Sequence, residues 1–174
     1  MSVFLILVID QDRQTTYLII IKFPNYFCHT QSNWAPMASI SSNKATFLSS
    51  LHSSKAETEP YTHWNLDNVF DQDAIDGILA LPIETPRVEY DEGQRAANND
   101  IRGYFDKARR EEFEICEVVS SIFQSPETIC ALESVCKVDL KGSFLRVEYA
   151  QDHNGFWLEP HKDISVKLFS MLIY

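Results

Sequence analysis

Two strand-like runs near the C-terminal end of the sequence most constrain what this chain can fold into. Ser143 to Tyr149 and Lys167 to Tyr174 carry apolar and aromatic residues typical of strands, and a polar segment separates them. That segment contains His161-Lys162-Asp163. On an extended chain, side chains two positions apart point to the same side, so this imidazole and this carboxylate can reach one metal ion.

A histidine and a carboxylate so arranged supply two corners of the facial triad that holds non-haem Fe(II) and leaves coordination positions open. The third corner, a second histidine from later in the chain, is absent because the sequence stops at Tyr174. A hydrolytic zinc site made of His153, His161 and Asp163 is an alternative use of the same residues. An isolated His-x-Asp pair is also common as a structural ion pair. The prediction of a metal site therefore rests on the flanking strands and on Pro160, which favours an extended backbone before His161.

Length, charge and hydropathy restrict the class of protein. The 174 residues, 45% of them hydrophobic, are enough for one domain with its own core. A net charge of −10 argues against a nucleic-acid partner, which would require clustered Lys and Arg. No apolar run approaches the roughly 20 residues that span a bilayer, so no membrane segment is expected. The four cysteines form no C-x-x-C pair, and Cys116 and Cys130 lie in apolar helical patterns, which indicates reduced core thiols and a cytoplasmic protein.

Residues 1–36 are predicted to be an upstream extension outside the domain. Charged residues at positions 10, 12 and 13 separate two apolar runs. Met37 begins a segment that is typical of the N-terminus of a protein, which indicates a second translation start. The alternative is a genuine β-hairpin, because residues 15–21 have strong strand propensity. Residues 37–59 are expected to form a loose leader or a short helix, and residues 60–174 the domain itself.

Helices are predicted to precede strands along the domain. Asp71 is expected to cap a helix over residues 72–81, and Ser125, followed by proline, to cap another. Residues 106–123 carry apolar positions at helical spacing, and a short strand is expected at 101–105. With strands from residue 138 onward, the pattern predicts an α+β fold.

Three segments together resemble a known family. Phe144 to Tyr149, Gly155 to Asp163 and Lys167 to Tyr174 look like the first half of the double-stranded β-helix core of the 2-oxoglutarate- and Fe(II)-dependent oxygenases. The resemblance is closest to the prolyl-hydroxylase-like branch and its bacterial relatives. Residues 96–102 and the two helices that follow also resemble the N-terminal part of those bacterial relatives. It covers roughly residues 60–174. It implies N-terminal helices packed on an incomplete jelly-roll, or cupin-like, core.

The resemblance also implies an activity and its cofactors. Members of the family oxidise a C–H bond, usually by hydroxylation, with Fe(II) as the metal and 2-oxoglutarate as co-substrate; ascorbate is a further candidate cofactor. His161 and Asp163 match two of the family's iron ligands. Tyr149 and Tyr174 match positions that contact 2-oxoglutarate, although half-buried strand tyrosines are common without such a role.

Further residues are assigned on weaker grounds. Arg146 and Trp157 are expected to border the substrate pocket, with cross-strand packing as the alternative for Trp157. The substrate, a small molecule or a protein side chain, is not specified by the resemblance. His29, His52 and His63 are expected on the surface.

The family's distal histidine and the basic residue that pairs with the far carboxylate of 2-oxoglutarate match no residue here. The chain is therefore expected to be a C-terminally truncated fragment that is inactive alone. A half-built sheet would leave the apolar strand Leu168 to Ile173 with an uncovered edge. The competing prediction is a non-catalytic fragment that binds a partner, or a second copy of itself, through that edge.

Overall fold

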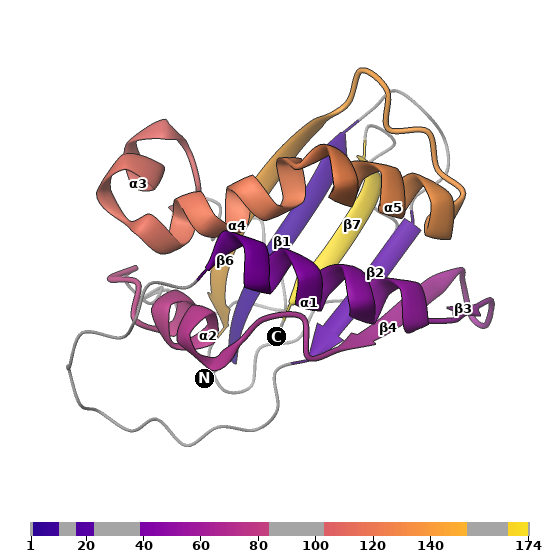
Figure 1. The fold of residues 1–174 in the computed structure, drawn as a ribbon, viewed down its shortest axis with the longest axis horizontal. Coiled ribbons are helices and arrows are strands. Elements are labelled where there is room, and N and C mark those ends of the chain that lie inside the picture. The colour runs from indigo at the N-terminus through magenta and orange to yellow at the C-terminus, as the bar shows by residue number, and fades with distance from the viewer. Residues whose placement is uncertain (1, 11–16, 23–38, 84–102, 153–166, 174) are drawn as a thin grey trace, which may run out of the picture.

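A computed structural model of the chain describes residues 2–10, 17–22, 39–83, 103–152 and 167–173. These residues form one seven-stranded sheet, with helices packed on one of its faces (Figure 1). The coarse prediction of an α+β fold is therefore confirmed.

The sheet mixes parallel and antiparallel pairs in the order β3-β4-β2-β7-β1-β6-β5. Its strands are β1 (Ser2–Asp10), β2 (Tyr17–Lys22), β3 (Ala56–Glu57), β4 (His63–Asp67), β5 (Gly103–Tyr104), β6 (Phe144–Asp152) and β7 (Lys167–Ile173). Strand β1 is antiparallel to both β6 and β7, whereas β2 is parallel to both β7 and β4. The two strands at the edges of the sheet, β3 and β5, have only two residues each.

The first two strands differ from the expectation that residues 1–36 lie outside the domain. Strand β1 pairs between β6 and β7, and β2 pairs between β7 and β4. The alternative of a β-hairpin is also not what forms, because β7 separates β1 from β2. As a consequence, the strand expected to have an uncovered edge at Leu168 to Ile173 has neighbours on both sides, and that prediction was wrong.

Five helices complete the described part of the chain: α1 (Ile40–Ser53), α2 (Gln72–Leu79), α3 (Lys107–Glu112), α4 (Glu114–Gln124) and α5 (Pro126–Cys136). The predicted caps are confirmed: Asp71 accepts from the Ala74 backbone N–H at 2.9 Å, and Ser125 accepts from Thr128 N–H at 3.3 Å. Residues 37–59, expected as a loose leader or a short helix, contain the longest of these helices, α1. The predicted continuous helix over 106–123 is interrupted at Phe113, whose backbone is extended.

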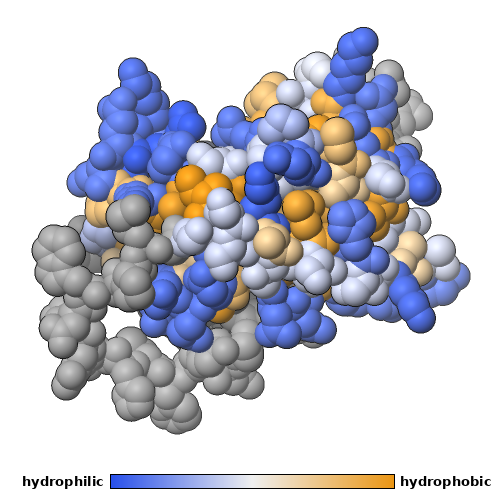
Figure 2. Space-filling view, viewed as in Figure 1, coloured by the Kyte–Doolittle hydropathy of each residue, from blue (hydrophilic) through white to orange (hydrophobic). Residues whose placement is uncertain are grey.

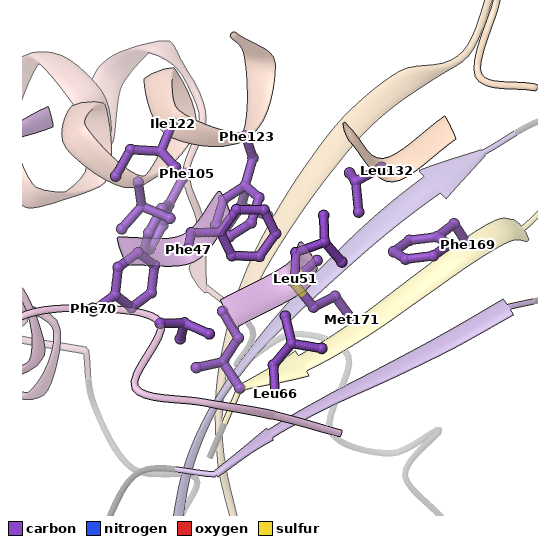
Figure 3. Packing of buried hydrophobic residues seen from close by; sticks show 14 of the residues in the cluster. Phe47, Leu51, Leu66, Phe70, Phe105, Ile122, Phe123, Leu132, Phe169 and Met171 are labelled. Atoms are coloured by element: carbon purple, nitrogen blue, oxygen red, sulfur yellow. The ribbon is translucent and has the colours of Figure 1, made fainter. Parts of the chain in front are cut away.

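The core lies between α1, α4, α5 and the sheet (Figures 1 and 3). Figure 3 shows Phe47 and Leu51 of α1 beside Phe123 of α4, with Phe169 and Met171 of β7 beneath them. All five side chains are at least 96% buried. Burial of each such side chain is worth about 1.5–3 kcal/mol, so this layer dominates the stability of the fold.

A buried polar contact fixes the start of two helices. Asn43 is completely buried; its amide donates to an Asp71 carboxylate oxygen at 2.8 Å, and its carbonyl oxygen accepts from the Asp71 backbone N–H at 2.8 Å. Asp71 is at the same time the N-cap of α2. The pair therefore joins the first turn of α1 to the first turn of α2.

Candidate functional site

Several of the predicted site residues lie outside the described residues. These are the two expected iron ligands, His161 and Asp163, together with Trp157, Tyr174 and the zinc alternative His153. Their positions in the chain relative to the described elements are nevertheless defined, because β6 ends at Asp152 and β7 begins at Lys167. The structure therefore forms the two strands that the sequence placed on either side of the His-x-Asp motif.

Tyr149, the expected 2-oxoglutarate contact on β6, lies on the face of the sheet that the helices cover. Along β6, Tyr149 and Val147 share one face because strand side chains alternate. Val147 and Met171 both pair with Leu7 of β1, one from each side, so they share a face of the sheet. Met171 packs under α1. Tyr149 is completely buried there. We call this side, which carries Val147, Tyr149, Met171 and Ile173, the helix face.

Arg146, expected near the substrate, lies on the other side of the sheet, which we call the opposite face. Its guanidinium Nε donates to a carboxylate oxygen of Glu148 at 2.7 Å. The Glu148 side chain is 2% exposed and that of Arg146 is 35% exposed. Arg146 and Tyr149 therefore lie on different faces of one regular strand.

Glu148 is a residue that the sequence analysis did not single out. It lies almost fully buried on the opposite face, and Ser170 of β7 is also buried there, in register with Arg146 across β1. A buried carboxylate costs stability unless it is paired, and Arg146 supplies the pairing. The signal was available in the sequence as a basic and an acidic residue two positions apart in a predicted strand.

His63, expected on the surface, is instead 8% exposed, whereas His52 is exposed as expected. Strand β3 lies beside His63, and the His63 Nε2 is 3.6 Å from a carboxylate oxygen of Glu57. Its Nδ1 lies 2.9 Å from the Tyr61 carbonyl oxygen. Asn65 donates to the other Glu57 oxygen at 2.8 Å. These groups tie the edge strand β3 to β4.

A groove of about 680 Å³ runs between α1 and the end of β4. Hydroxyl, amide and carboxylate groups line it, among them Thr46, Ser49, Ser50, Ser53, Asp67 and Asn68. The sequence analysis did not identify this groove. The missed signal is the three- and four-residue spacing of these hydroxyls, which places them along one side of a helix.

The cysteines match the prediction in part. Cys116 and Cys136 are buried free thiols, and burial raises their pKa values to about 11 and about 12, respectively. Cys130, which was expected in the core, is exposed. A buried thiol with a raised pKa is protonated at neutral pH and is a poor nucleophile, so neither Cys116 nor Cys136 is a catalytic candidate.

Among the described residues, no three His, Cys, Asp or Glu side chains form a group that could hold a metal ion. A three-ligand metal site built from these residue types would therefore need residues outside that part of the chain. The described helices include none that is long and apolar enough to cross a membrane.

Comparison with known proteins adds no relative. No model of a known protein family matches the chain, and neither a curated protein nor a solved structure does so.

Proposed function

We propose that this chain carries part of an Fe(II)- and 2-oxoglutarate-dependent oxygenase, with His161 and Asp163 as two of the iron ligands. The observation that supports the proposal is the sequence Pro160-His161-Lys162-Asp163 between β6 and β7, two strands of one sheet. One imidazole and one carboxylate are the donor types that a non-haem Fe(II) site takes from protein, and the donor set therefore fits the metal.

Iron bound with 2-oxoglutarate would supply the oxidising chemistry, in which a C–H bond of the substrate is hydroxylated. The share of the protein is to bind, to orient and to exclude water. On the opposite face, the buried Glu148 holds the Arg146 guanidinium in one orientation. Arg146 remains our candidate for a substrate contact, because a fixed guanidinium binds carboxylates and other planar acceptors in a defined geometry.

The finer fold is proposed only for part of the sheet. A jelly roll is built of antiparallel strands, and β6, β1 and β7 are antiparallel neighbours as such a core requires. The parallel pairs of β2 with β7 and β4 depart from it. We therefore propose that β6 and β7 are the strands of an oxygenase-like core, while β2 and β4 extend the sheet in a different manner.

Anaerobic titration with Fe(II) tests the proposal. We expect the chain to bind Fe(II), and either His161→Ala or Asp163→Ala to weaken binding at least about tenfold, since each removes one of few protein ligands. His52→Ala, which removes an exposed histidine of α1, serves as the matched control and is expected to bind like the unaltered chain. Equal affinity in all four proteins would refute the assignment.

The same titration with Zn²⁺ separates the hydrolytic alternative. Tight zinc binding that is lost in His153→Ala would favour that site, whereas the iron proposal requires His153→Ala to leave Fe(II) affinity unchanged.

A second candidate, association through a strand edge, now concerns β6 instead of β7. Within the described ranges, the two residues of β5 pair with Glu148 and Tyr149 of the nine-residue β6, and the Phe105 backbone N–H donates to the Val147 carbonyl at 3.0 Å. Phe144 at the start of β6 is 64% exposed. Unpaired strand edges attract other chains. Sedimentation velocity at increasing protein concentration tests this candidate: a dimer that Phe144→Lys abolishes supports it, and a monomer at all concentrations excludes it.

A further inference from the structure

A histidine and a carboxylate lie next to each other on the strand pair β3 and β4. Glu57 is the register partner of His63, so the two side chains share a face of the sheet. The His63 Nε2 lies 3.6 Å from the Glu57 Oε2, a separation too long for an N–H···O hydrogen bond. The His63 side chain is 10% exposed and that of Glu57 is 57% exposed, so ions can reach the pair from its acidic side.

The tautomer of His63 follows from the contact of its other ring nitrogen. The Nδ1 atom lies 2.9 Å from the Tyr61 carbonyl oxygen, and a carbonyl oxygen can only accept a hydrogen bond. Nδ1 therefore carries the proton, and Nε2 has a lone pair when the imidazole is neutral. A neutral His63 thus leaves two electron-rich atoms 3.6 Å apart, and a cation between them would stabilise the arrangement.

Neighbouring groups hold both donor atoms in place. The Asn65 side-chain amide donates to the Glu57 Oε1 at 2.8 Å, and the Tyr61 carbonyl fixes the imidazole ring through Nδ1. Histidines that bind metals usually donate their other ring N–H to a carbonyl or carboxylate oxygen, and ligating carboxylates are likewise hydrogen-bonded. His63 and Glu57 therefore have the outer contacts that are typical of metal ligands.

We propose that the His63 Nε2 and the Glu57 Oε2 bind a divalent transition-metal cation, for which Zn²⁺ is the best fit. Zinc bonds to imidazole nitrogen and carboxylate oxygen are about 2.0–2.2 Å long, so a 3.6 Å separation corresponds to about 120° at the metal, near the tetrahedral angle. No third His, Cys, Asp or Glu of the described ranges joins the pair. Two protein ligands define an exchangeable site that ties β3 to β4. This inference is independent of the proposed oxygenase activity.

The charge around the pair favours a cation. Between residues 55 and 67, three carboxylates accompany the single lysine Lys55: those of Glu57, Glu59 and Asp67. The chain as a whole carries a net charge of −10. Figure 2 shows hydrophilic side chains exposed at the end of the molecule where Figure 1 places β3. The local field therefore raises the concentration of divalent cations near the pair.

The test is a zinc titration of the full chain, followed by NMR through the side-chain nitrogen resonances of its histidines. Mildly alkaline pH keeps the imidazoles neutral. We expect the His63 Nε2 resonance to shift saturably with added Zn²⁺. Glu57→Gln should weaken this binding at least about tenfold, because an amide is not an anionic ligand. The variant keeps an oxygen that can accept from Asn65, so β3 is expected to stay paired with β4.

Two controls separate the pair from a lone histidine and from the general acidity of the protein. His52 also holds a carbonyl oxygen against its Nδ1, that of Leu48 at 2.7 Å, but it has no ion pair with a carboxylate of the described residues. Its resonances should shift far less than those of His63. Glu59→Gln makes the same change of charge at an exposed position nearby and should leave the zinc affinity of His63 unchanged.

Three results would overturn the proposal: a His63 Nε2 resonance that zinc does not shift, equal shifts of His52 and His63, or equal weakening by Glu57→Gln and Glu59→Gln. The pair would then serve only as a structural contact between β3 and β4. Because the resonance belongs to His63, zinc bound at His153, His161 and Asp163 does not mimic the expected result.

Discussion

The two faces of β6 carry different kinds of residue, although they alternate along one strand. The helix face presents Val147 and Tyr149, which join the apolar core beneath α1, α4 and α5. The opposite face presents Arg146 and Glu148, whose side chains form an ion pair that is buried at its acidic end. The first face gains free energy by removing apolar area from water, whereas the second must offset the cost of burying charge. Neighbouring residues of one strand are therefore buried for different energetic reasons.

The largest expected effect comes from the helix face. Tyr149→Ala should lower the free energy of unfolding by about 3–5 kcal/mol, because a completely buried aromatic ring is lost and a cavity remains. Urea denaturation followed by circular dichroism measures it. Phe144→Ala, on the same strand but 64% exposed, is the control and should change the free energy by less than about 0.5 kcal/mol. If the two variants lost equal stability, the assignment of Tyr149 to the core would be wrong.

The local features of the helices were predictable from sequence, because their causes are local. Asp71 and Ser125 cap helices through contacts with backbone groups three residues away, and both were identified. The interruption at Phe113 was not. No Pro or Gly marks it, and Phe113 instead packs, partly buried, against the core. A helical pattern in sequence cannot register a break that tertiary packing imposes.

The sheet and the candidate site were less predictable, because they depend on contacts distant in sequence. The alternation Arg146-Val147-Glu148-Tyr149 indicates a strand. It does not reveal which of the two alternating sets of side chains faces the helices. The order of strands decides this, and it brings β1 between β6 and β7. The burial of His63 likewise follows from its pairing with β3, a two-residue strand that no sequence pattern marks.

An intermediate effect is expected from the ion pair on the opposite face. Glu148→Ala should cost about 1–3 kcal/mol, since it removes the carboxylate to which the Arg146 Nε donates; the partial exposure of Arg146 keeps the loss below that of a fully buried pair. The double variant Arg146→Leu with Glu148→Leu should recover at least half of that loss, because no charge is left to bury. Urea denaturation of both variants measures the loss and its recovery. If the double variant had a lower free energy of unfolding than Glu148→Ala, the two side chains would contribute to stability by more than neutralising each other's charge.

The smallest effect is expected from an ion pair in the opposite environment, that of Lys44 and Glu127 on the surface of α1 and α5. The two side chains approach to 3.1 Å, and the Glu127 side chain is 60% exposed. Its pKa lies below the usual 4.5, first because a backbone N–H of the first turn of α5 donates to it and second because of Lys44.

A lowered native pKa stabilises the fold above the unfolded pKa, and the stabilisation disappears as the pH falls through the native value. Lys44→Gln should therefore raise the pKa of Glu127 only part of the way to 4.5, since the backbone hydrogen bond remains, and should leave the unfolding midpoint at pH 7 nearly unchanged. An NMR titration of the Glu127 side chain in both proteins measures the shift. A pKa that returned fully to 4.5 would mean that Lys44 is its sole cause. A large loss of stability at pH 7 would mean that this exposed pair behaves like Arg146 and Glu148, and the contrast between buried and solvated pairs would then fail.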